Sequence, residues 1–224
     1  MLYRVRKTWT DSKSQVGAYK ILENAKKTCD KHPGYSVYDE SGKAVYTSKK
    51  KTKQDKMCSW AKKIAASGDY HYKRWKSGDK KTQQCPICHN LKGKYKGFNC
   101  ICYAWASWHH GAKLPSECDC GVISNDIAEK ILKAKTDAEA TKIAQKYVGI
   151  KEVKVVRNKG KAIPVKDLKK GDVLLYFKGN TYFHTVLYIG KSKIAESNTT
   201  NPNIRYGVKL SPSYVKVAIR YTGK

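Results

Sequence analysis

The last third of the chain most constrains its fold, because it holds five apolar runs of strand length. These are KEVKVVR, DVLLYFK, YFHTVLYIG, KIAES and YVKVAIRYT, and the turn residues between them suit an antiparallel sheet. Two amphipathic helical patterns, SNDIAEKILKAK and TDAEATKIAQKYV, come before them. Helices followed by a block of strands are the order of an α+β domain, which we therefore predict for this part of the chain.

A change of composition divides the chain. Residues 48–56 contain the charged run KKKTKQDK, which is typical of a linker between modules. Before it, residues 1–47 predict a small β-α-β-β module: a strand at LYRVR, a helix over SQVGAYKILENAKKTCDKH, and a hairpin over GYSVYDESGKAVYTS. Residues 57–224 then form the α+β domain.

The chain is strongly basic, with 46 Lys and Arg residues against 18 Asp and Glu, a net charge of +28. Such a surface concentrates on polyanions, which include nucleic acid, anionic lipid and the teichoic acids of a Gram-positive wall. No apolar run reaches membrane-spanning length, and residues 1–14 lack the apolar segment of a signal peptide. We expect neither membrane insertion nor Sec-dependent export. In a reducing compartment, the eight cysteines then favour catalytic thiols or metal ligands over disulfides.

Cys100 is the candidate nucleophile. It follows Gly97-Phe98-Asn99 and opens ICYAWASWHHG, a pattern that predicts a helix of about three turns ending at Gly111. A thiol in the first helical turn has a lowered pKa, and the thiolate is the attacking form. Residues i and i+2 of a helix lie roughly 200° apart, so Cys102 faces another direction.

His184 is the candidate base. It lies early in a strand whose alternate residues include Val186 and Tyr188, and a cysteine nucleophile needs such a partner. His109 and His110 lie nearer in sequence, but the helical rise places them roughly 14 Å from Cys100. We interpret those two histidines as residues of the last turn that complement the helix dipole.

FNCICYAW, LKKGDVLLYF and HTVLYIG together resemble the NlpC-type cysteine peptidases of bacterial cell walls, which have a papain-like fold. The resemblance implies Cys100 as nucleophile, His184 as base, Glu196 at the position that orients the histidine, and no cofactor for the reaction. Asn99, Ile101 and Cys102 stand where that family usually has Asp, Ser and Gly. The family's tyrosine near the oxyanion would correspond to Tyr95.

Glu196 occupies a position where His, Asn or Gln is usual in that family. An acidic third member resembles the related CHAP amidases and endopeptidases, in which Glu and Asn would correspond to Glu196 and Asn198. Both residues lie in KIAESNTT, on one face of the predicted strand. Either could orient His184, and the bond that is cleaved stays open between an endopeptidase and an N-acetylmuramoyl-L-alanine amidase.

Residues 85–200 as a whole resemble the catalytic domains of endolysins from phages of clostridia. The N-terminal stretch is similar to a SPOR-like module of clostridial wall hydrolases, which implies wall binding. The resemblance therefore implies peptidoglycan and anionic wall polymers as partners. It also implies accumulation in the cytoplasm of the infected host and release to the wall through a holin pore.

The remaining cysteines include a C-x-x-C and a C-x-C pattern. Cys85, Cys88, Cys118 and Cys120 would form a four-thiolate structural zinc site, with His89 as a spare ligand. Free thiols, or a disulfide after release, are the alternatives.

A function of another class uses the same features. The basic charge, the CPICH knuckle and the tyrosines would also suit a zinc-stabilised nucleic-acid-binding protein. We consider it less favourable, because the basic residues are spread along the whole chain and the motifs GDVLLYF and HTVLYIG then have no role.

Overall fold

The computed structural model describes residues 1–48, 51–200 and 202–223. Its chain divides into two units, Met1–Thr52 and Lys53–Lys224. Lys49 and Lys50 of the predicted linker lie outside the described residues, and residues 53–56 are not linker but the first turn of a helix. Within the described ranges, no helix has the length and apolar character that crossing a membrane requires.

The smaller unit is a four-stranded antiparallel sheet with one helix. The strands have the order β2-β1-β3-β4, and the core consists of Val5, Ala25, Cys29 and Val37. The elements are β1 (Tyr3–Arg6), β2 (Gly17–Tyr19), α1 (Leu22–Lys31), β3 (Ser36–Tyr38) and β4 (Ala44–Thr47).

The predicted β-α-β-β order of this unit is wrong in one element. The helix begins at Leu22, and Gly17–Tyr19 forms an additional strand that pairs with β1. The short apolar pattern of Gly17–Tyr19 is compatible with either a helix or a strand. Pairing with the edge of β1 stabilises the strand conformation. The Tyr19 side chain still packs on α1, because its hydroxyl accepts a hydrogen bond from Thr28 at 2.7 Å.

The larger unit is built on a six-stranded sheet in the order β11-β10-β9-β8-β12-β7. Every neighbouring pair is antiparallel, so the predicted α+β class is confirmed. The strands are β7 (Val153–Arg157), β8 (Val173–Lys178), β9 (Thr181–Gly190), β10 (Lys193–Ser197), β11 (Ile204–Lys209) and β12 (Val215–Tyr221). The sequence predicted five of them; β11 was missed.

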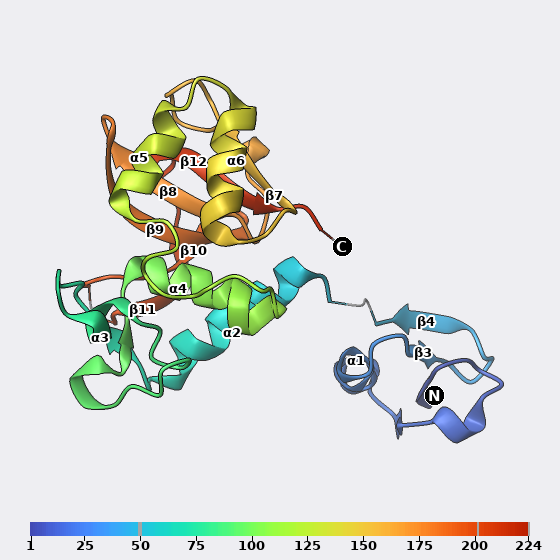
Figure 1. Ribbon diagram of the computed structural model, residues 1–224. Helices are drawn as coiled ribbons and strands as arrows, with labels where there is room; N and C mark the ends of the chain where they lie inside the picture. Colours follow the sequence, from blue (N-terminus) through green and yellow to red (C-terminus); the bar gives the residue numbers. More distant parts are fainter. Residues whose placement is uncertain (49–50, 201, 224) are drawn as a thin grey trace. The chain divides into compact units, whose positions relative to one another are not determined.

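Helices cover one face of this sheet (Figure 1). Helix α6 lies on β7 and α5 on β9 and β12, whereas α4 lies on β9 and β10 and α2 on β10 and β11. The helical elements are α2 (Lys53–Ser67), α3 (Lys80–Gln83), α4 (Cys100–Ala106), its π-helical continuation η3 (Ser107–Gly111), α5 (Asn125–Lys133) and α6 (Asp137–Val148). A short parallel pair, β5 (His71–Tyr72) and β6 (Gly97–Phe98), precedes α4.

Both faces of the central strands are apolar. In β8, Val173, Leu175 and Phe177 belong to the core under the helices. The alternate residues Leu174 and Tyr176 belong to a second core on the opposite face. The loops that carry Leu168 and Leu210 close that second core.

Two local features fix the helix that carries Cys100. Gly111 ends η3 against α2, where an added Cβ would lie 2.9 Å from the Lys56 carbonyl oxygen and from Trp60 Cβ. Trp108 is fully buried, and its indole N–H donates to the Gly171 carbonyl at 3.0 Å. The helix is thereby held between α2 and the turn that enters β8.

Candidate active site

Cys100 begins α4, as the sequence predicted. The preceding Asn99 caps the helix, because its side-chain oxygen accepts a hydrogen bond from the Cys102 N–H at 2.9 Å. Cys100 is partly exposed, whereas Cys102 is fully buried. Cys102 lies near Cys85 and Cys120, so the two neighbouring cysteines do face different surroundings.

His184 on β9 lies beside the Cys100 thiol, close enough for the two side chains to shift each other's pKa. Its Nε2 lies 2.8 Å from Glu196 Oε2, which leaves Nδ1 to face the thiol. The carboxylate can only accept, so Nε2 carries a proton and donates it to Glu196. The Tyr176 ring, 5.8 Å from the imidazole ring, lies edge-on beside it. The sequence thus identified three residues that the fold brings into one chain of contacts.

Glu196 is buried and makes a second ion pair, with Arg205 on β11. The side-chain oxygen of Asn198, the other residue that the sequence left open, accepts from the Thr200 N–H at 2.8 Å instead. The geometry therefore selects Glu196 as the partner of His184. Arg205 was missed, because it lies on the strand that the sequence analysis did not recognise.

The pKa values of Cys100, His184 and Glu196 are all shifted in the direction that favours the charged form of each group. Burial raises the pKa of the Cys100 thiol, but the hydrogen bond and charge of His184, with backbone hydrogen bonds from Thr185 and Ile101, bring it below its ordinary value. Burial lowers the pKa of His184, but Cys100 and Glu196 raise it to about 9. Burial opposes ionisation of Glu196, yet His184 and Arg205 hold the pKa of its carboxyl below the ordinary value. These shifts favour a thiolate beside an imidazolium over the neutral pair.

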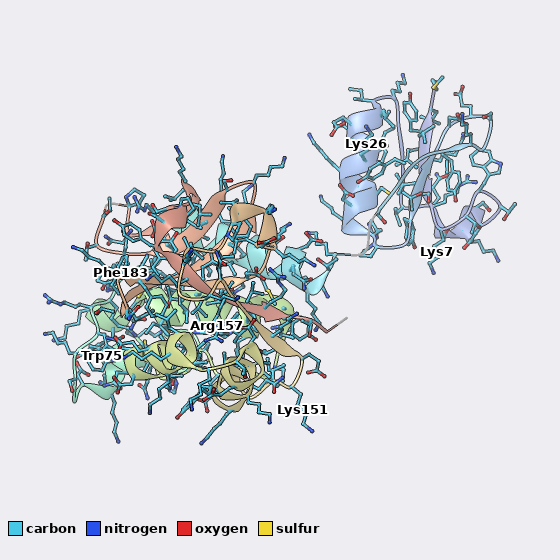
Figure 2. All side chains as sticks on the ribbon, turned by 90° about the horizontal axis from the view of Figure 1, so that it is seen from above. Lys7, Lys26, Trp75, Lys151, Arg157 and Phe183 are labelled. Carbon is cyan, nitrogen blue, oxygen red and sulfur yellow. The ribbon has the colours of Figure 1, made fainter. Side chains whose placement is uncertain are left out.

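Cys100 lies between two adjoining hollows. One, of about 430 Å³, extends past Trp75, Cys120 and Asp126. The other, of about 370 Å³, extends past His184, Glu196 and Asn198. Both hollows are also lined by Tyr72, Cys100 and Phe183, so they form one groove across the thiol, which we call the Cys100 groove. Figure 2 shows Trp75 and Phe183 on the same side of the larger unit.

The tyrosines beside Cys100 are not the one that the resemblance implied. Tyr95 lines a different hollow, on the side of Tyr72 that bears Arg74 and Lys94, and lies under the ammonium groups of Lys81 and Lys94. Tyr72 lines the Cys100 groove instead. Tyr182 is buried next to Cys100, and its hydroxyl is 2.5 Å from Thr185 Oγ1. Tyr72 comes from the short strand β5, which carried no recognisable signal in the sequence.

The predicted metal ligands are only partly brought together. Cys85, Cys88 and Cys118 converge, and His110 joins them in place of Cys120. The Cys120 Sγ instead contacts the Asn99 amide and the Thr82 carbonyl. His89, the predicted spare ligand, is 3.0 Å from Asp119 Oδ2.

Helices on one face of an antiparallel sheet, with a cysteine at a helix start and a histidine on a neighbouring strand, are the arrangement of papain-like thiol hydrolases. Residues 106–220 match the model of the NlpC/P60 family, and the chain belongs to that family. Its members are in general cell-wall peptidases that use a cysteine and a histidine, and membership implies peptidoglycan as the substrate. The matched region contains His184 and Glu196 and begins beyond Cys100.

Two solved structures show similarity to the chain. The P60 domain of antigen MAP1204 from M. avium subspecies paratuberculosis is 12% identical with a TM-score of 0.39, and the match covers 77% of this chain and 100% of that one. NlpC2 from Trichomonas vaginalis is 16% identical with a TM-score of 0.36, and the match covers 85% of this chain and 58% of that one. No curated protein matches the chain in sequence.

Proposed function

We propose that this protein hydrolyses an amide bond in the peptide stems of peptidoglycan, with Cys100 as nucleophile, His184 as acid and base, and Glu196 as the residue that orients the imidazole. One observation carries the proposal: thiol, imidazole and carboxylate form a continuous chain of contacts that opens into the Cys100 groove. Family membership supports the substrate class.

In the first half of the reaction, the Cys100 thiolate attacks the carbonyl carbon of the amide. The C–N bond breaks as His184 donates its Nδ1 proton to the leaving nitrogen, so that a free amine departs and a thioester remains. In the second half, neutral His184 takes a proton from water, and the resulting hydroxide attacks the thioester. The C–S bond breaks, the thiolate and imidazolium are restored, and the carboxylic acid that leaves gives its proton to solvent.

The acidic third member supports a second candidate for the bond. Glu196 contacts His184 directly, and a carboxylate in this position resembles the CHAP amidases more than the usual NlpC-type peptidases. The second candidate is therefore cleavage between N-acetylmuramic acid and L-alanine, with the same three residues in the same roles. Mass spectrometry of the released fragments distinguishes the two, because an amidase frees whole stems and an endopeptidase divides them.

We further propose that the protein acts as an endolysin of clostridial type. The smaller unit would bind the wall as a SPOR-like module. The net charge of +28 would retain the protein on anionic wall polymers. Lys7 in the smaller unit and Lys151 in the larger one are both exposed (Figure 2), so both units contribute to this charge. As an endolysin the protein would accumulate in the infected cytoplasm and reach the wall through a holin pore.

The test is lysis of purified Gram-positive walls by wild type, Cys100→Ala and the matched variant Cys102→Ala. We expect Cys100→Ala to lose lysis while it keeps the wild-type circular dichroism spectrum. Cys102→Ala should retain lysis, because that thiol is buried away from the groove. Lysis by Cys100→Ala at the wild-type rate would refute the nucleophile. Absence of lysis by wild type, together with tight nucleic-acid binding, would favour the nucleic-acid-binding alternative.

A further inference from the structure

Four side chains from three chain segments meet in a group that the proposed reaction does not use. Cys85 and Cys88 come from the segment after α3, His110 from η3, and Cys118 from the loop before α5. Their ligand atoms all lie within 4.8 Å of one another. Cys85 and Cys118 are buried, and Cys88 is exposed. We call these four residues the thiol–imidazole cluster.

The distances from the His110 nitrogen to the three sulfurs fit a tetrahedral ion. The Cys88 and Cys118 sulfurs, 3.1 Å apart, would separate by about 0.7 Å to reach the tetrahedral spacing. Zinc bonds of about 2.3 Å to sulfur and about 2.0–2.1 Å to nitrogen place two thiolates about 3.8 Å apart and a thiolate about 3.6 Å from an imidazole nitrogen. The His110 Nε2 lies 3.5 Å from Cys85 Sγ, 3.4 Å from Cys88 Sγ and 3.9 Å from Cys118 Sγ. We propose that the thiol–imidazole cluster is a structural zinc site with three cysteine ligands and one histidine ligand.

The chemistry of the donors supports zinc over two simpler interpretations. Thiolates and imidazole together select soft or borderline ions such as Zn²⁺ over Mg²⁺ or Ca²⁺. A disulfide between Cys88 and Cys118, whose sulfurs lie 3.1 Å apart, would leave Cys85 and His110 facing it without a role. A network of free thiols would bring three weak donors to one imidazole nitrogen, which can use only one of them.

The surroundings hold these ligands in place. The Asp119 carboxylate accepts from the Cys85 N–H at 2.6 Å and contacts His89 at 3.0 Å. It therefore joins the segment of the first two ligands to that of Cys118. The Trp60 ring stacks on His110, with 5.7 Å between the ring centroids, and limits its rotation. Such contacts around the ligands are a feature of stable metal sites.

All four positions are supplied by protein, which is the arrangement of a structural site rather than a catalytic one. A bound zinc ion would join three parts of the chain: the segment before β6, the loop before α5 and the end of η3. Cys120 in that loop donates its N–H to the Gln83 carbonyl at 2.8 Å, lies against Asn99, and lines the Cys100 groove. The proposal does not depend on the assignment of the nucleophile.

The experiment is metal analysis of the full chain, purified in reductant, supplied with zinc and desalted. We expect about one zinc per chain by mass spectrometry. In competition with a chelator, His110→Ala and Cys118→Ser should each lower zinc affinity at least about tenfold. Cys120→Ser is the matched control and should keep wild-type zinc content, because Cys120 does not belong to the cluster.

A second measurement covers the case in which a ligand variant fails to fold. Wild type reconstituted with Co²⁺ should show intense tetrahedral d–d bands and thiolate-to-cobalt charge transfer. Reduced wild type that takes up neither zinc nor cobalt would overturn the proposal. Loss of zinc from Cys120→Ser with full retention in His110→Ala would overturn the ligand set and restore the four-cysteine alternative.

Discussion

Replacing Glu196 with Gln should move the alkaline limb of the activity profile to lower pH. Protonated His184 is the form that donates to the leaving amine, so activity is present below its pKa and is lost as the pH rises through it. That pKa is about 9, because Cys100 and Glu196 outweigh the effect of burial. The substitution keeps the shape of the side chain but removes one of these two negative partners.

The size of the change follows from the contacts of Glu196. An opposite charge at hydrogen-bond distance shifts a pKa by about 1–3 units, so the limb should move from about 9 toward neutrality. Each unit corresponds to about 1.4 kcal/mol, or a factor of about ten in the population of the ion pair. The Arg205 guanidinium, which pairs with Glu196, would be left uncompensated and would lower the pKa of His184 further.

The assay is kcat/KM between pH 5 and 10 on a soluble stem-peptide fragment. Because the thiol and imidazole titrate together, the two limbs belong to the pair. Glu152→Gln is the matched control, since Glu152 is an exposed glutamate of the same unit. Arg205→Gln removes a positive charge near His184, so the alkaline limb of this variant should lie at or above its wild-type pH. A Glu196→Gln profile that coincides with wild type would refute the role of the carboxylate.

Three other outcomes are expected. Asp172→Asn should lower the free energy of unfolding in urea by about 3–5 kcal/mol, because it leaves Arg220 partly buried without the carboxylate that pairs with it at 2.7 Å. Asp137→Asn, which removes a mostly exposed partner of Arg157, should cost at most about 1 kcal/mol. Gly111→Ala should lower the melting temperature through about 1–3 kcal/mol of overpacking against α2, whereas Gly121→Ala, which meets no atom within 4 Å, should not. Wall lysis should decrease as salt rises, because salt screens the attraction of a +28 chain to anionic polymers. Hydrolysis of the small soluble stem fragment should change much less, and equal salt dependence in both assays would contradict that role of the charge.

The elements that could be predicted are those with a strong local pattern. Most of the five predicted strands of the larger sheet carry runs of Val, Ile, Leu and aromatic residues, and His184 and Glu196 lie on two of the five. Cys100 was recognisable because a turn and a cap come directly before an aromatic helix. Strand β11 was not recognisable, since Gly207 interrupts it with a φ of +87° and its residues are mostly half-buried.

The contacts that escaped prediction join segments far apart in the chain. Arg205 reaches Glu196 only because β11 pairs with β10. Tyr72 reaches the Cys100 groove because β5 pairs in parallel with β6, directly before the nucleophile. Neither pairing leaves a periodic signal in the sequence, because β5 has only two residues and β11 is interrupted by Gly207. Cys120 looked equivalent to Cys118 in the C-x-C pattern, and an extended segment would place the two on one face. The chain instead bends at Asp119 and enters a turn at Cys120, which separates the two thiols.

The π-helical turn η3 explains why His110 could not be assigned from helical geometry. On a regular α-helix, His110 would lie roughly 80° around the axis beyond Cys102. A π turn has more residues per turn, so each residue of Ser107–Gly111 advances less around the axis. His110 is thereby turned back toward the side of Cys102, where both residues meet Cys85. Cys100, which precedes the turn, keeps its position in the groove. The irregularity thus serves the thiol–imidazole cluster and leaves the nucleophile where the regular helix places it.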